Sequence, residues 1–171
     1  MSQLTQHATR NTQFTHYAIW APLVLVLGLT IGLRWFRFTT FPPSLWYDEA
    51  YTLAQGQRLA QDGEFHIYYP EKHGEPAIIW LTALALKLGA GHLAPRWVSS
   101  TGGVISVLLL FLAVRDVMRH QSEHADWIAV GSAAVLGTNY EFLFHTRMSW
   151  QAALVTPFFT VATWFFWRGM R

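Results

Sequence analysis

The chain has 171 residues, of which 52% are hydrophobic, 16% are aromatic and only 13% are charged. An ordinary soluble domain carries about 25% charged residues, so this composition argues against a soluble enzyme. The formal net charge is +2, and the basic residues stand singly between apolar stretches. That distribution fits membrane orientation better than a nucleic-acid-binding face, so we expect no nucleic-acid partner. The chain has no cysteine, which excludes disulfides and thiolate metal sites.

Apolar stretches of nearly membrane-spanning length dominate the chain. Residues 1–16 form a polar tail, and residues 17–171 carry the stretches that we interpret as spans of a bilayer core about 30 Å thick. These stretches are 17–33, 77–93, 98–114, 127–140 and 150–167. The sequence therefore predicts an all-α, polytopic integral membrane protein with about five transmembrane helices. We expect it in a bacterial inner membrane or a plasma membrane, with the lipid bilayer as a partner.

Two of these stretches fit a span less well than the others. Residues 77–93 contain Lys87 and the Gly89-Ala90-Gly91 break, and residues 127–140 are short for a bilayer crossing. With five spans and an inside N-terminus, the basic connector 115–119 falls outside, against the positive-inside tendency. If 77–93 is not a span, the conflict disappears and four spans remain. The sequence thus allows four or five spans, and we adopt five because of the resemblance described below.

The connector 38–76 concentrates the polar chemistry of the chain. Six of the ten acidic residues lie between Asp48 and Glu75, together with His66 and His73. A long solvated loop tolerates acids without any further role. The concentration nevertheless makes this connector the place to look for a site, and we expect it to be an external loop.

An amphipathic helix is expected inside this loop. It begins after Pro42-Pro43, runs to about Gln61 and ends at Gly63. The positions on one face at helical spacing are apolar: Trp46, Ala50, Leu53, Ala54 and Ala60. We therefore predict a helix that lies in the plane of the membrane surface with its polar face toward water. The free N–H groups of the first turn favour the ionised forms of Asp48 and Glu49. These carboxylates have two readings: one of them acts as a base or binds a cation, or both only complement the helix dipole.

Several short elements follow one another in a particular order. They are a first span ending at Arg34, Trp46-Tyr-Asp48-Glu49-Ala50, Tyr69-Pro70, His73-Gly-Glu75-Pro76, Pro95-Arg96-Trp-Val-Ser-Ser-Thr-Gly102, and a later span beginning near Arg147. In order and spacing, residues from about 18 onward resemble the N-terminal part of the C-type, polyprenyl-phosphate-dependent glycosyltransferases, the group of protein O-mannosyltransferases and lipid A aminoarabinose transferases. The resemblance implies that 77–93 is a true span, which is why we adopt five.

The resemblance also implies an activity and roles for single residues. Such enzymes transfer a sugar, with inversion, from a polyprenyl-phosphate donor to a hydroxyl of a lipid, glycan or protein acceptor, and the catalytic acid of the first external loop corresponds to Asp48, with Glu49 beside it. Aminoarabinose transferases carry an arginine implicated in holding lipid phosphate where this chain has Tyr51. Phosphate contact is then expected from other cations, for which the candidates are Arg58, Lys72 and Arg96. For Arg96 the other reading is an anchor at the boundary of a span.

A divalent cation is the one cofactor that the sequence offers. Glu75 and His73 could hold it, although two ligands do not complete a site, and His73 is equally explained as a loop histidine in water. The alternative to an enzyme is a non-enzymatic membrane partner subunit, or a carrier of lipid-linked sugars, because members of the resembling family have many more spans. On this reading the chain is a fragment or truncated member that works with a partner membrane subunit. A small transporter fits less well, since no predicted span contains an acidic residue.

Overall fold

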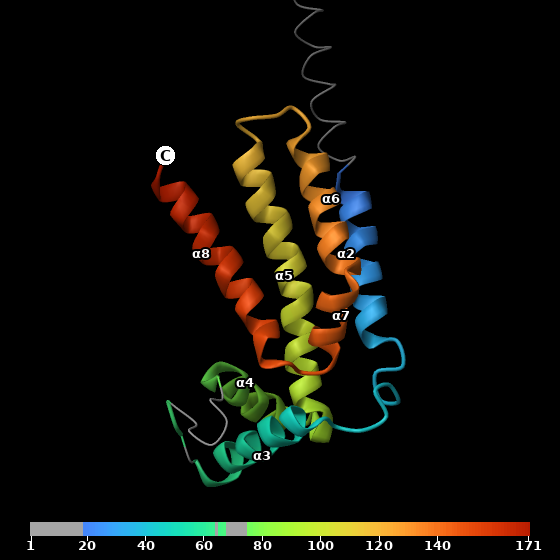
Figure 1. Ribbon diagram of the computed structural model, residues 1–171, viewed down its shortest axis with the longest axis vertical. Helices are drawn as coiled ribbons and strands as arrows, with labels where there is room; N and C mark the ends of the chain where they lie inside the picture. Colours follow the sequence, from blue (N-terminus) through green and yellow to red (C-terminus); the bar gives the residue numbers. More distant parts are fainter. Residues whose placement is uncertain (1–18, 64, 68–74) are drawn as a thin grey trace, which may run out of the picture.

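The computed structural model describes residues 19–63, 65–67 and 75–171 (Figure 1). These residues form seven α-helices and two short 3-10 helices, and no strand occurs among them, which confirms the all-α prediction for this part of the chain. The helices are α2 (Trp20–Trp35), α3 (Tyr47–Asp62), α4 (Pro76–Lys87), α5 (Ala94–Met118), α6 (Ala125–Thr138), α7 (Tyr140–Arg147) and α8 (Val155–Gly169), with 3-10 helices η1 (Gly91–Leu93) and η2 (Gln151–Leu154).

Helix α5 is the axis around which the other helices are arranged. Helices α2, α6 and α8 run beside it, and α3 and α4 lie across one end of this bundle (Figure 1). The chain runs along α2 toward the α3/α4 end, returns along α5, descends again through α6 and α7, and returns along α8. The connector between α5 and α6 and the end of α8 therefore lie together at the opposite end.

One helix is long and apolar enough to cross a membrane. It is the continuous segment Gly91–Met118, 28 residues long, within which a window of 18 residues has a mean hydropathy of 2.0. Helices α2, α4 and α6 are apolar but shorter, at 16, 12 and 14 residues. The described helices thus confirm one membrane-length helix, where the sequence predicts about five.

The stretch 77–93 is not one continuous helix. Helix α4 ends at Lys87, and Gly89 and Gly91 then adopt left-handed conformations with φ of +90° and +61°. Twelve residues of α-helix extend about 18 Å, well short of a bilayer core of about 30 Å. The break that the glycines indicate is therefore present, and it leaves α4 as a short helix beside α3 at one end of the bundle (Figure 1).

The predicted amphipathic helix is confirmed in its bounds but not in its orientation. Helix α3 begins at Tyr47 and ends before Gly63, whose φ of +73° suits the left-handed C-cap position. The prediction that its polar face points to water is wrong. Its buried side is a polar and small-residue face that packs against α4 and α5, formed by Glu49, Thr52, Gln55 and Gly56. Trp46 and Ala50 of the predicted apolar face are exposed.

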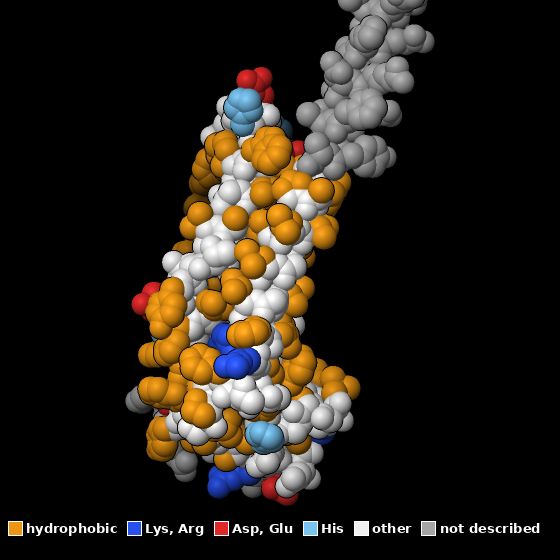
Figure 2. All heavy atoms as spheres, turned by 90° about the vertical axis from the view of Figure 1, so that its right-hand side faces the viewer, with side chains coloured by type: hydrophobic (Ala, Val, Ile, Leu, Met, Phe, Trp, Pro, Cys, Tyr) orange, Lys and Arg blue, Asp and Glu red, His pale blue; other side chains and the backbone are white. Residues whose placement is uncertain are grey.

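Small side chains fill the helix interfaces, and large apolar ones cover the outside. A Cβ atom at Gly102 would lie 2.7 Å from Leu154 Cδ2, and one at Gly103 would lie 2.6 Å from Arg34 Nε, so α5 approaches its neighbours closely at both positions. Outside, Leu25 is 73% exposed and Phe159 71% exposed. Figure 2 shows apolar side chains over most of the upright helices on the side that it faces.

Gly56→Ala tests the close packing of α3 on α4. A Cβ atom there would lie 2.8 Å from Thr82 Cγ2 and 3.2 Å from Thr82 Cβ. Threonine is β-branched and stiff in a helix, so it cannot turn away, and we expect a loss of about 1–3 kcal/mol in unfolding free energy. Gly131→Ala is the control, because nothing lies within 4 Å of its Cβ position on α6. The two variants are compared by thermal unfolding in detergent, and equal stability of both would contradict this packing.

Candidate functional site

A buried ion pair fixes the start of α3. Arg96, in the first turn of α5, donates from Nε to Glu49 Oε1 at 2.9 Å and from Nη2 to Glu49 Oε2 at 3.0 Å. Glu49 is fully buried and Arg96 is 2% exposed. The same carboxylate accepts the backbone N–H of Trp46 at 2.9 Å, which is the side-chain half of a capping box. Both oxygens of Glu49 are therefore occupied within the fold.

Two arginines hold the connector between α2 and α3 by its carbonyl groups. Arg96 donates to Pro42 O at 2.9 Å and Ser44 O at 2.7 Å. Arg147, the last residue of α7, donates to the carbonyl oxygens of Leu33, Phe36 and Phe41 at 2.7 to 3.0 Å. The segment that precedes α3 is thus anchored to α5 and α7, in addition to the turn hydrogen bonds that Thr40 and Phe41 donate to Arg37 O.

Asp48 points away from the buried pair. Successive residues of an α-helix are turned by about 100°, so the inward position of Glu49 places Asp48 on a different face of the first turn. Asp48 is exposed there. Of the two carboxylates that the sequence singles out, Asp48 is the one that a ligand can reach, while Glu49 positions the helix that carries it.

An apolar groove begins near this turn. Tyr51 packs against the cluster of Ile78, Ile79 and Leu154, and Leu154 also lines a groove of about 530 Å³ between α4, α5 and α8. The groove walls are apolar and include Leu84, Trp97, Ile105, Pro157, Phe158 and Val161. Because Asp48 and Tyr51 are three residues apart on α3, they are neighbours on the helix surface. Tyr51 therefore links the first turn of α3, which carries the exposed carboxylate, to the cluster whose Leu154 lines the groove.

Glu75 lies at a second hollow that shares Leu154 with the groove. It is the N-cap residue of α4 and is partly buried beside Val155 and Phe158. Burial raises the pKa of the Glu75 carboxyl above its ordinary value. A metal ligand must be deprotonated, so this environment works against the predicted cation site. In the described part of the chain, no three His, Asp or Glu side chains come together as metal ligands, and His73 lies outside the described residues.

The candidates for phosphate contact are not brought together. Arg96 uses its guanidinium to hold Glu49 and the connector inside the fold, a role that neither the phosphate-binding nor the span-boundary reading anticipated. Arg58 is exposed on α3, ten residues from Asp48 and so about 15 Å along the helix axis. Lys72 lies outside the described residues. Of the two candidates that the structure describes, Arg96 is therefore buried inside the fold and Arg58 is exposed.

Sequence reasoning missed the part played by two other arginines. Arg147 had no assigned role beyond marking a span boundary, although it holds the connector as firmly as Arg96 does. Arg37 is exposed with a left-handed φ of +52°, and its guanidinium lies 5.8 Å from the centre of the Phe36 ring. No local signal in the sequence of α7 identifies the carbonyl partners of Arg147, which lie more than 100 residues earlier in the chain. No local signal identifies the conformation of Arg37.

Comparison of the chain with protein-family models, with curated proteins and with solved structures finds no match.

Arg96→Met tests whether the buried pair holds this end of the molecule. The substitution leaves Glu49 charged and buried without its partner, and we expect a loss of about 3–5 kcal/mol in unfolding free energy. The double variant Arg96→Met/Glu49→Leu removes both charges and recovers part of that loss. Arg58→Gln, at an exposed position of α3, changes stability by no more than about 0.5 kcal/mol. Chemical unfolding of the purified chain measures all three, and a loss below about 1 kcal/mol for Arg96→Met would overturn this role.

Proposed function

We propose that this chain forms the first catalytic loop and donor groove of a membrane glycosyltransferase that uses a polyprenyl-phosphate-linked sugar. One observation carries the proposal: an exposed carboxylate, Asp48, stands on a helix turn locked by a buried ion pair, and Tyr51, one turn further along α3, packs against the cluster whose Leu154 lines an apolar groove. Each part has a counterpart in the chemistry, since the reaction needs a base in water and a place for an isoprenoid chain. The sequence resemblance supports the same assignment.

The distribution of side chains supports a multi-pass membrane placement. Large apolar residues are exposed on α2 and α8, including Val24 at 66% and Phe166 at 68%, whereas soluble monomers rarely expose such surfaces contiguously. The interior instead contains buried Ser99, Ser106 and Thr146. Small and hydroxyl-bearing residues at helix contacts are typical of helices packed in lipid.

We further propose four membrane helices, α2, α5, α6 and α8, with α3 and α4 on the external face. The α5–α6 connector carries Arg119, and α8 ends with Arg168 and Arg171, so this arrangement gathers basic residues at the end opposite α3. With four spans that end lies inside, which agrees with the positive-inside tendency. The conflict that five predicted spans created does not arise in this arrangement, because α4 lies across the bundle end.

In the proposed reaction Asp48 is the general base. Its carboxylate takes the proton of the acceptor hydroxyl while the oxygen attacks the anomeric carbon. A bond forms between that oxygen and the anomeric carbon, the bond to the donor phosphate breaks with its electron pair, and polyprenyl phosphate leaves. This single displacement inverts the anomeric centre. Arg96 cannot meet the charge of the leaving phosphate while it holds Glu49, and Arg58 stands about 15 Å along α3 from Asp48, so that task falls to another exposed cation, for which Arg37 is the candidate.

Asp48→Asn tests the catalytic role. We expect sugar transfer to fall about 10²–10⁴-fold, because the amide cannot accept the proton of the acceptor. Asp62→Asn is the matched control, since Asp62 is an exposed carboxylate on the same helix. Transfer of radiolabelled sugar from a set of polyprenyl-phosphate donors is measured in membranes holding equal amounts of each protein. Equal transfer by both variants would remove Asp48 from the mechanism, and no transfer by the unaltered chain would favour the partner-subunit alternative.

Single-cysteine variants test the membrane arrangement independently. The chain has no cysteine, so Gln57→Cys on α3 and Glu123→Cys in the α5–α6 connector each carry one thiol, and both positions are exposed. A membrane-impermeant maleimide applied to intact cells should label Gln57→Cys, and should label Glu123→Cys only after the membrane is opened. Labelling of both variants, or of Glu123→Cys alone, in intact cells would contradict the proposed orientation.

A further inference from the structure

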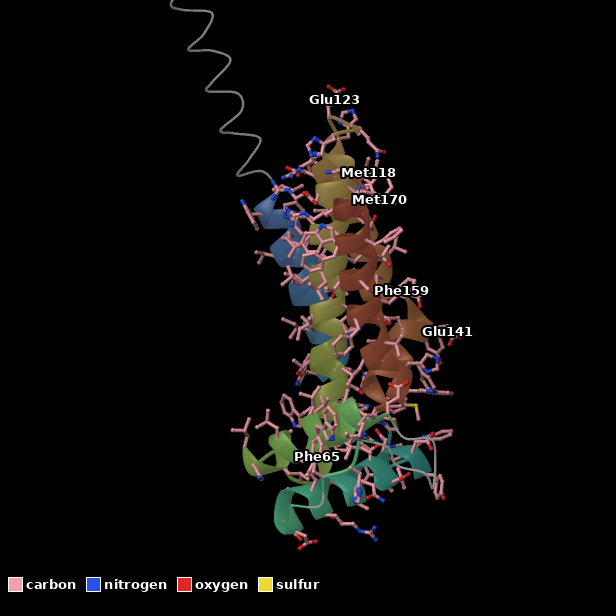
Figure 3. The ribbon with its side chains drawn as sticks, turned by 90° about the vertical axis from the view of Figure 1, so that its left-hand side faces the viewer. Phe65, Met118, Glu123, Glu141, Phe159 and Met170 are labelled. Atoms are coloured by element: carbon pink, nitrogen blue, oxygen red, sulfur yellow. The ribbon has the colours of Figure 1, made fainter. Side chains whose placement is uncertain are left out.

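A charged hollow lies at the end of the bundle farthest from Asp48. It measures about 650 Å³ and is formed by α5, the α5–α6 connector, the start of α6 and Trp164 of α8. The labels on Met118, Glu123 and Met170 in Figure 3 mark this end, and Phe65 marks the other. The wall has an apolar part, Leu112 and Trp164, and a charged part, Arg115, Asp116, Arg119 and Asp126.

Asp116 gathers three partners at the inner wall of this hollow. It accepts a hydrogen bond from Trp164 Nε1 at 2.9 Å and pairs with Arg119 at 2.9 Å and with Arg168 at 3.5 Å. Arg171 donates to the carbonyl oxygen of Asp116 at 3.3 Å. These contacts join the end of α8 to the end of α5, so the side chains at the inner wall of the hollow are held in place by hydrogen bonds and ion pairs.

The arginines retain donors for an outside acceptor. Arg115 binds Asp126 through Nε at 2.6 Å, and Arg119 binds Asp116 through Nη2 and His120 through Nε. Within the described part of the chain, both Nη groups of Arg115 and Nη1 of Arg119 have no recorded acceptor. Glu123 lines the hollow as well, so the lining itself carries two arginines against three carboxylates. Arg168 and Arg171, which contact Asp116 from the end of α8, bring this end of the bundle to four arginines against three carboxylates.

We propose that this hollow binds the phosphate of an anionic phospholipid headgroup. The inference rests on the proposed membrane placement and not on the transfer reaction. Arg115 and Arg119 face the phosphate, and Leu112 and Trp164 lie beside the first carbons of the acyl chains. Tryptophan indole rings prefer the level of the headgroups, and basic pockets between membrane helices on the inner side suit anionic headgroups. The lipid bridges α5, α6 and α8, the helices whose residues line the hollow.

Removal of the two arginines tests the site. Binding of phosphatidylglycerol to the full chain, purified in detergent, is titrated by native mass spectrometry without any sugar donor. Arg119→Gln should weaken binding about fivefold and Arg115→Gln/Arg119→Gln about 25-fold, since each arginine near a lipid phosphate contributes comparably. Lys87→Gln, an exposed cation at the other end, should leave binding unchanged. Thermal unfolding without lipid checks that each variant is folded. The side chain of Arg119 is 57% exposed, so its replacement should have little effect on folding.

Soluble glycerol 3-phosphate and phosphatidylcholine distinguish the source of the phosphate. A lipid site should bind phosphatidylglycerol most tightly and soluble glycerol phosphate not at all, and binding should weaken with salt. Equal binding by the double variant, an equal loss in Lys87→Gln, or equally tight binding of soluble glycerol phosphate would each overturn the proposal. The binding experiment does not measure sugar transfer, so it tests the lipid site separately from the proposed reaction. Lipid binding without transfer would contradict only the proposed reaction, and transfer without lipid binding would contradict only the lipid site.

Discussion

The ion pair between Glu49 and Arg96 is the interaction on which the α3/α4 end depends. Transferring two charges out of water costs several kcal/mol for each ion, and only good geometry with further hydrogen bonds offsets that loss. Both conditions are met, because the contact is bidentate and the guanidinium also binds the carbonyl oxygens of Pro42 and Ser44. One residue thereby fixes the first turn of α3, the connector before it and the start of α5 relative to one another. The direction in which Asp48 points follows from this arrangement.

Small polar side chains and large apolar ones share the interior of the bundle. Thr30 and Ser100 are fully buried, and so are Val107 and Phe111 of the apolar core, while other large apolar side chains of α2 and α8 lie outside. Glycines at the contacts let the helices approach until a single added methyl group would overlap its neighbour, as at Gly103. The same close approach explains how the polar face of α3 can pack on α4, since Gly56 and Thr82 form a small-residue contact.

The sequence predicted local features better than their placement. The bounds of α3 follow from the prolines before it and Gly63 after it, and the break at Gly89 was visible, because these signals act on the backbone of a few residues. Helical periodicity cannot say whether a face meets water, lipid or another helix, and so the orientation of α3 was wrong. Apolar composition likewise cannot distinguish a helix along the bundle from one across its end, and the family resemblance was what made 77–93 a predicted span. The pairing of Glu49 with Arg96 joins residues 47 apart and has no local signature.

The two ends of the bundle use arginine in opposite ways, and this constrains the chemistry. At the α3/α4 end Arg34 and Arg96 are buried, and with Arg147 they donate to backbone carbonyl groups or Glu49, so their charge maintains the fold. An anion that drew Arg96 away would leave Glu49 unpaired and release the connector. Arg37, by contrast, is exposed, and its left-handed backbone persists only where its surroundings fix it. Those surroundings are the stacked rings of Trp35 and Phe38 and the carbonyl contacts of Arg147, so the groups that hold the fold also set where the exposed charge stands.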